Sequence, residues 1–138
     1  MRKVVLTGIR KMDMVNAAEP LIRNSGEVKI RLSSVGVCGS DIHYYNEGRI
    51  GTQVVDFPFA LGHECSGIIE ETGKDVKNVA PGDLVVIDPA LHCGHCDQCV
   101  AGRPHTCRNI RFLGCPGQLE GCLHESVVPG SFGSDHID

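Results

Sequence analysis

The sequence predicts a mainly β (α+β) fold, a barrel built from short strands, and three observations support this. Glycine accounts for 17 of the 138 residues, against an average near 7%, which indicates many tight turns. The apolar segments are short, and aromatic residues make up only 4%, with no Trp, so the core must rely on Val, Ile and Leu. A chain of this length has room for one domain with a modest core.

The strands are expected at short apolar or alternating segments. Residues 4–6 form the first, and residues 27–32 alternate polar and apolar with the period of two that a half-buried strand shows. The turn signals Thr72-Gly73 and Pro81-Gly82-Asp83 separate the third expected strand from the fourth. The later strands are expected at residues 66–71, 84–87 and 123–128.

One short helix is expected between the second and third strands, over residues 41–46. Ser40 or Asp41 would be its N-cap, since both side chains can accept a hydrogen bond from a free backbone N–H. Residues 48–58 contain two glycines and a proline and are expected to form a loop.

Charge and hydropathy exclude several classes of protein. The formal net charge is −4, from 13 Lys and Arg against 17 Asp and Glu, which argues against nucleic acid or an anionic membrane as a partner. The longest apolar runs have four residues, whereas a membrane-spanning helix needs about 20. Arg10 and Lys11 interrupt the first apolar stretch too early for an export signal, so we expect a cytoplasmic protein.

Four of the eight cysteines follow the pattern Cys-x2-Cys-x2-Cys-x7-Cys, at Cys93, Cys96, Cys99 and Cys107. This spacing suits a structural zinc site with four thiolates. Residues 92–111 have almost no periodic apolar pattern, so a metal would supply the folding free energy that they lack. Free or disulfide-linked cysteines and an iron–sulfur cluster are the alternatives. In ferredoxins the fourth cysteine follows after three residues and precedes Pro, whereas Arg108 follows here, so zinc is favoured.

A second cluster combines one sulfur, one imidazole and one carboxylate, at Cys38, His63 and Glu64. Three mixed protein ligands with a fourth position left open are typical of catalytic zinc. Neighbours on a strand point to opposite faces, so Glu64 could ligate only if the chain turns there, and would otherwise lie behind the ligands. Asp41 could hydrogen-bond His63 and so orient it, without binding the metal itself.

Ser40 and His43 are three residues apart, so on a helical turn they share a face. A hydroxyl followed by an imidazole can pass a proton outward to solvent. Taken singly, each residue also has an ordinary role, Ser40 as a helix cap and His43 as a surface histidine. The remaining cysteines, at positions 65, 115 and 122, lack metal-like spacing and are interpreted as buried thiols.

Four segments in this order resemble the zinc-dependent medium-chain alcohol dehydrogenases. They are Gly-Val-Cys-Gly-Ser-Asp-Ile-His at 36–43, Leu-Gly-His-Glu at 61–64, Pro-Gly-Asp-Leu-Val at 81–85, and the four-cysteine segment. Tyr44-Tyr45 and Gly-Arg-Ile-Gly at 48–51 are most similar to the sorbitol, xylitol and related polyol dehydrogenases. The resemblance implies a GroES-like catalytic domain, a partly closed barrel. We expect this domain over residues 1–128, with the zinc lobe at 92–111, and a frayed tail at 129–138.

The resemblance also implies roles for single residues. Cys38 and His63 would hold catalytic zinc, with Glu64 as a ligand or close neighbour. Ser40 would accept the proton of the alcohol, and His43 would relay it. Tyr44 would line the substrate pocket, and the four cysteines of the lobe would hold structural zinc. Members of this family transfer hydride from the alcohol to NAD or NADP, so the implied substrate is a small polyol or secondary alcohol.

No Gly-x-Gly-x-x-Gly follows a predicted strand, so no Rossmann domain and no cofactor-binding residues are expected in this chain. We therefore expect a truncated N-terminal catalytic domain that is inactive alone. Two other hypotheses stay open. One is a stand-alone zinc-binding assembly module, since unfinished sheet edges could pair with another copy. The other, less favoured, is an iron–sulfur electron carrier.

Overall fold

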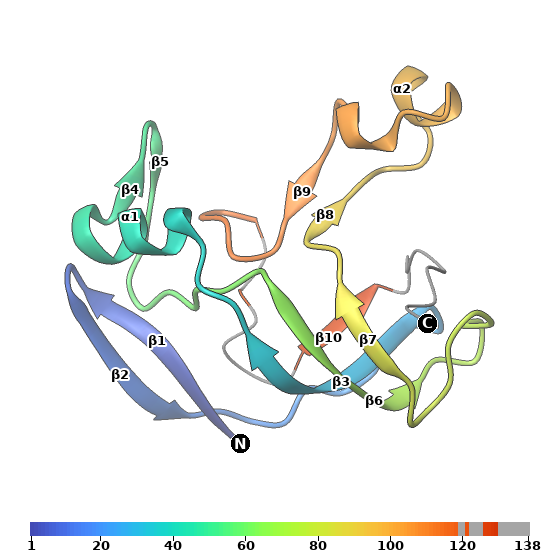
Figure 1. Ribbon diagram of the computed structural model, residues 1–138, viewed down its shortest axis with the longest axis horizontal. Helices are drawn as coiled ribbons and strands as arrows, with labels where there is room; N and C mark the ends of the chain where they lie inside the picture. The colour runs from blue at the N-terminus through green and yellow to red at the C-terminus, as the bar shows by residue number, and fades with distance from the viewer. Residues whose placement is uncertain (119–120, 122–125, 130–138) are drawn as a thin grey trace.

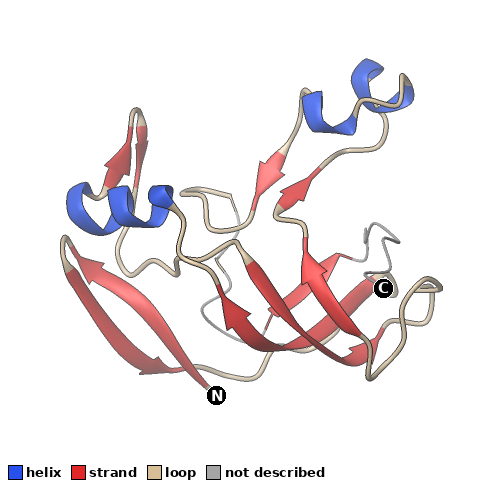
Figure 2. Ribbon diagram, in the orientation of Figure 1, coloured by secondary structure: helices blue, strands red, loops and turns tan. Residues whose placement is uncertain are grey.

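The structure, a computed structural model, describes residues 1–118, 121 and 126–129, and strands dominate it (Figure 2). In chain order the elements are β1 (Arg2–Gly8), β2 (Lys11–Asn16), β3 (Glu27–Val35), α1 (Gly39–Glu47), β4 (Arg49–Ile50), β5 (Gln53–Val54), β6 (Cys65–Thr72), β7 (Leu84–Ile87), β8 (Ala90–Leu91), α2 (Asp97–Val100), a 3₁₀ helix (Pro104–Thr106), β9 (Arg111–Phe112) and β10 (Ser126–Pro129). The predicted mainly β fold class is confirmed.

A four-stranded antiparallel sheet in the order β10-β3-β6-β7 forms the centre of the molecule (Figure 1). The hairpin of β1 and β2 attaches through a bridge in which Leu6 and Phe59 exchange backbone hydrogen bonds of 2.7 and 2.9 Å. Helix α1 leaves β3 at one end of this sheet. The segment that carries α2 continues from β7 through β8 and projects away from the central sheet (Figure 1).

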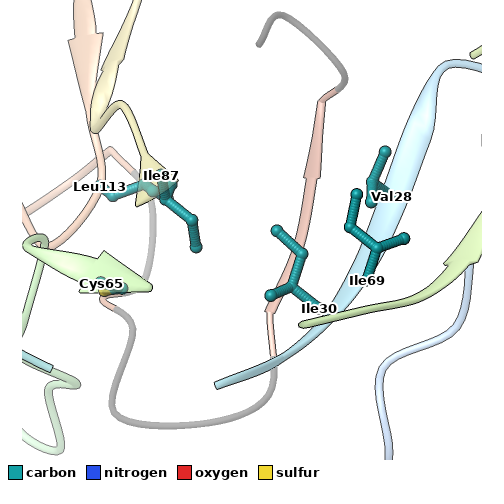
Figure 3. Packing of buried hydrophobic residues seen from close by; sticks show 6 residues of the cluster. All are labelled: Val28, Ile30, Cys65, Ile69, Ile87 and Leu113. Atoms are coloured by element: carbon teal, nitrogen blue, oxygen red, sulfur yellow. The ribbon is translucent and has the colours of Figure 1, made fainter. Parts of the chain in front are cut away.

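The main core lies between β3, β6 and β7 and the loop after β9 (Figure 3). It consists of Val28, Ile30, Cys65, Ile69, Ile87 and Leu113, all buried. The alternation that predicts β3 places Val28 and Ile30 on the same face. At Gly67 of β6 a Cβ would lie 2.7 Å from Ile30 Cγ2, so the close approach of β3 requires glycine there.

Helix α1 begins earlier than the sequence predicts. Its N-cap is Cys38, not Ser40 or Asp41, and Asp41 lies at the third helical position. From there the Asp41 carboxylate accepts the backbone N–H of Cys38 at 3.0 Å, so Asp41 satisfies a free donor of the helix start from inside the helix. The helix ends at Gly48, whose φ of 68° suits glycine and whose N–H donates to the Tyr44 carbonyl at 2.9 Å.

Other sequence predictions hold in part. Residues 84–87 form β7 as predicted, and the segments 4–6, 27–32 and 66–71 lie inside longer strands. The predicted loop 48–58 contains the small hairpin of β4 and β5, which corrects that prediction. Strand β2 was not predicted at all. Residues 123–125 of the last predicted strand and residues 130–138 of the predicted tail lie outside the described residues.

No helix in the described part of the chain is long and apolar enough to span a membrane.

Two candidate metal centres

The first candidate centre lies in the four-cysteine lobe, residues 92–111, which β8 and β9 close at its base. The two strands pair Ala90 with Phe112 and Leu91 with Arg111. All residues of the lobe are described, and Cys107 is the only buried one among them. A segment with so little apolar burial has no hydrophobic core of its own.

The four sulfur atoms of the lobe converge. One ligand atom each from Cys93, Cys96, Cys99 and Cys107 lies within 4.8 Å of the others. The Cys96 sulfur is 3.6 Å from that of Cys99 and 3.9 Å from that of Cys107. A regular tetrahedron with zinc–sulfur bonds of about 2.3 Å has edges of about 3.8 Å. The sulfur arrangement therefore fits a tetrahedral zinc ion.

The surroundings of the four sulfurs favour the thiolate at some cysteines of the lobe and oppose it at others. The backbone N–H of His95, with the amide of Asn109, lowers the pKa of Cys93. Burial raises the pKa of Cys99, and the neighbouring Cys96 adds to this. The Cys107 sulfur accepts the backbone N–H groups of Cys93 and Asn109, each at 3.3 Å. Four crowded sulfurs cannot all ionise without a cation between them, and a dication would meet this need.

Arg108 forms an ion pair within the lobe, with Asp97. Its guanidinium donates to both oxygens of Asp97 at 2.6 and 2.8 Å. This pairing lowers the pKa of Asp97 to about 2. The ion pair joins the start of α2 to the residue after Cys107 and so braces the lobe.

The second candidate centre unites residues from two segments. Cys38 is the N-cap of α1, while His63 and Glu64 precede β6 in irregular backbone. One ligand atom from each of the three lies within 4.8 Å of the others. Because Glu64 is not on a strand, its neighbour His63 does not force it to the opposite face, and both can face Cys38.

Asp41 connects the two segments of this centre. It is 6% exposed, and while Oδ2 accepts the Cys38 N–H, Oδ1 accepts the N–H of Gly62 at 3.3 Å. The same Oδ1 lies 3.7 Å from His63 Nδ1. This geometry leaves the other ring nitrogen of His63 for an ion, which is the usual arrangement of metal-bound histidines.

Two hollows flank the second centre. One, of about 300 Å³, is mostly apolar and is lined by Met12, Val35, Val37, Ile42, Tyr45 and Leu61 with Gly36, Asp41 and Gly62. The other, of about 360 Å³, contains His63 and Glu64 themselves with the hydroxyl residues Ser34 and Ser66. Small polar molecules could therefore reach the carboxylate and imidazole from the second hollow.

The remaining predicted site residues lie on α1. Ser40, two residues after Cys38, is half-buried, and His43 is exposed, with Nδ1 3.3 Å from Glu47 Oε1. Tyr44 is 2% exposed in a second core cluster, and its hydroxyl donates to Gln53 Oε1 at 3.1 Å. Burial raises the Tyr44 pKa to about 12. Its neighbour Tyr45 is partly buried against the same cluster and also lines the apolar hollow.

The other cysteines differ in state. Cys65 is buried, as predicted, but it is disulfide-bonded and not a thiol, which corrects that interpretation. Cys115 is a half-buried free thiol, and burial raises its pKa. Cys122 lies outside the described residues.

Comparison with known proteins gives consistent matches. Residues 24–131 match the family model of the alcohol dehydrogenase GroES-like domain. The chain is 42% identical over 116 residues to a sorbitol dehydrogenase of Bacillus subtilis, covering 84% of this chain and 33% of that protein. It is 39% identical over 133 residues to a D-xylulose reductase of Morganella morganii, covering 96% and 39%.

Solved structures agree. The galactitol-1-phosphate dehydrogenase of Escherichia coli matches with a TM-score of 0.83 and 31% identity over 94% of this chain and 36% of that one. An alcohol dehydrogenase of Thermus sp. ATN1 matches with a TM-score of 0.83 and 30% identity, over 95% and 38%. The chain thus spans about a third of the length of the curated relatives that it matches.

Proposed function

Because the chain belongs to the family of alcohol dehydrogenase GroES-like domains, we propose that it is the zinc-binding catalytic portion of an NAD(P)-dependent dehydrogenase that oxidises a polyol or secondary alcohol to a ketone. The observation that carries this proposal is the convergence of Cys38, His63 and Glu64. One thiolate, one imidazole and one carboxylate form a donor set of the catalytic zinc type, with a fourth position left for substrate.

Zinc held there would act as a Lewis acid that lowers the pKa of the substrate hydroxyl. The chain's own residues take the proton away. Ser40, two residues after Cys38, accepts this proton at Oγ and gives its own hydroxyl proton to His43, three residues further along α1, which passes it on. His43 is suited to this because its side chain is 61% exposed and Nδ1 lies beside Glu47, so the proton reaches solvent.

The four-cysteine lobe has a structural role in this proposal. Its four sulfurs leave no open position, and closed sites of this kind stabilise folds rather than react.

A polyol is supported as the substrate class by two observations. The curated relatives include proteins named sorbitol dehydrogenase, D-xylulose reductase and L-idonate 5-dehydrogenase. The hollow that contains His63 and Glu64 also offers the hydroxyls of Ser34 and Ser66, which can hydrogen-bond a second substrate hydroxyl.

The hydride acceptor, NAD or NADP, is proposed to bind residues outside this chain. The described strands pair antiparallel, whereas a dinucleotide-binding fold is built on a parallel sheet. The isolated chain is therefore expected to produce no NADH or NADPH from polyols even when loaded with zinc.

The proposal is tested by replacing the matching segment of the Bacillus subtilis sorbitol dehydrogenase with this chain. The chimera should oxidise polyols with NAD, and the same chimera with Cys38→Ser should not. A chimera that folds and binds zinc and NAD but oxidises no polyol would contradict the proposal. Rapid turnover by the 138-residue chain alone would contradict the external cofactor site.

A stand-alone zinc-binding assembly module is a second candidate, and the edge of the sheet favours it. Within the described residues β7 pairs only with β6, and it exposes Leu84 (72%) and Val86 (63%). Edge strands of this kind can pair with another chain. A dimer in solution that dissociates when a chelator is added would favour this candidate, and a monomer under both conditions would exclude it.

A further inference from the structure

Gly36 lies directly against Glu64, the carboxylate of the second centre. The Gly36 N–H donates to the Glu64 carbonyl at 2.6 Å. A Cβ built on Gly36 would lie 2.7 Å from Glu64 Oε2, 3.0 Å from Glu64 Cβ and 3.4 Å from the Glu64 carbonyl oxygen. The three nearest atoms to the missing side chain thus all belong to Glu64.

The backbone conformation does not explain this glycine. Positive φ angles occur at other glycines, such as Gly48 and Gly62, but Gly36 is not among them. An L-residue could therefore adopt its conformation, and what position 36 requires is the absence of a Cβ. Gly39, three residues later, contrasts with it because a Cβ there would meet nothing within 4 Å.

Because Gly36 has no Cβ, the Glu64 side chain can pack against its backbone, and this contact fixes the position of the Glu64 carboxylate. Glu64 is exposed, and an exposed glutamate loses rotamer freedom when it is fixed in one position. Its stem rests against Gly36 while one of its oxygens lies within 4.8 Å of ligand atoms of Cys38 and His63. A side chain at position 36 would occupy that place.

We propose that Gly36 is a positioning residue: the absence of a Cβ at position 36 keeps the Glu64 carboxylate facing Cys38 and His63. This inference rests on the proposed function, which places zinc at this centre. It also explains how a carboxylate in irregular backbone is oriented toward the centre although it is exposed.

Ala at position 36 would displace the carboxylate. The contact with Glu64 Oε2 could be relieved by rotating the end of the side chain, but the contact with Glu64 Cβ could not. The carboxylate would therefore leave its place beside Cys38 and His63. We expect Gly36→Ala to weaken zinc binding at this centre about 10- to 100-fold, the range typical of changes to residues that orient ligands.

The test compares zinc affinity and the absorption spectrum of the cobalt(II)-substituted chain for the wild type and the variants Gly36→Ala, Gly39→Ala and Glu64→Ala. Gly36→Ala should change the second-centre spectrum in the same way as Glu64→Ala. It should add little to zinc loss in the Glu64→Ala background, because it acts through Glu64. Gly39→Ala is the matched control and should match the wild type.

Four results separate failure of this inference from failure of the proposed function. A wild-type spectrum and wild-type affinity in Gly36→Ala would overturn the inference, as would equal losses in Gly36→Ala and Gly39→Ala. A Glu64→Ala variant that binds zinc as the wild type does would overturn it too. Absence of any difference between the wild type and Cys38→Ser would instead refute the proposed function. The cobalt(II) bands of the four-cysteine lobe report whether each variant is folded.

Discussion

Asp41 and His63, 22 residues apart in the chain, approach to 3.7 Å between Oδ1 and Nδ1. The Asp41 carboxylate also accepts hydrogen bonds from the backbone N–H of Cys38, at the start of α1, and from the backbone N–H of Gly62, in the loop before β6. A single buried carboxylate thus sets the distance between two of the three ligands of the second centre.

Asp41→Asn should weaken zinc binding at the second centre about 10- to 100-fold, because the amide loses the charge that orients and polarises His63. Asp56→Asn, at an exposed aspartate, is the control and should bind zinc as the wild type does. Competition with a chromophoric chelator measures both affinities. Equal affinities in Asp41→Asn and the wild type would show that Asp41 does not support the ligand.

Removal of metal should unfold the four-cysteine lobe and leave the central sheet folded. Cys107 is the only buried residue among 92–111, so the lobe has no core to hold it without an ion. With a chelator, amides of the lobe should exchange faster and trypsin should cut after Arg108, which Asn109 follows, while amides of β3 and β6 stay protected. Lobe exchange that is unchanged by the chelator would contradict this. Cys115→Ser should respond to the chelator as the wild type does.

The four-cysteine site could be recognised from the sequence because its four candidate ligands lie within one short segment, so their spacing is visible without the fold. Leu84–Ile87, between two turn signals, could be placed for the same reason. The role of Asp41 could be suggested but not its link to Gly62, since that contact joins distant segments. Strand β2 escaped prediction because its apolar Met12 and Met14 are both exposed and it follows a turn at Arg10, a non-glycine residue with φ of 58°.

The two adjacent tyrosines show a further limit of prediction from the sequence. The family resemblance assigns Tyr44 to a substrate pocket, and that role stays a prediction. The phase of α1 buries Tyr44 in the second core cluster, while Tyr45 is partly buried against that cluster and also lines the apolar hollow. A helix of nine residues with few apolar positions gives no periodicity that fixes this phase. The starting residue of the helix, set by Cys38 and Asp41, decides it.

Tyr44→Phe should destabilise the chain by about 1 kcal/mol, the usual net value of a hydrogen bond, because Gln53 loses its donor. Tyr45→Phe is the matched control and should change the free energy of unfolding less. Denaturant unfolding of both variants measures the difference. A larger loss in Tyr45→Phe than in Tyr44→Phe would contradict the placement of the two rings.

Stability should depend on pH through Glu27. Its carboxylate accepts the backbone N–H of Arg23 at 2.7 Å and the side-chain amide of Asn24 at 2.6 Å, and these bonds lower its pKa below 4.5. A folded-state pKa below the unfolded one stabilises the fold above the unfolded value, and this stability is lost as pH falls through the folded one.

The difference in unfolding free energy between the wild type and Glu27→Gln should therefore be constant near neutral pH. It should shrink as pH falls below about 4.5. Taking the difference removes the acid titration of the metal ligands, which both proteins share. Glu71→Gln, at an exposed glutamate of β6, is the control. A difference that does not change with pH would refute the role of Glu27.

The metal content of the purified, reduced chain tests most directly whether both centres bind a divalent ion. Elemental analysis should find two zinc ions per chain, and one in each of the variants Cys38→Ser and Cys107→Ser. A folded chain that contains no zinc, and takes up none when zinc is supplied, would contradict both centres together.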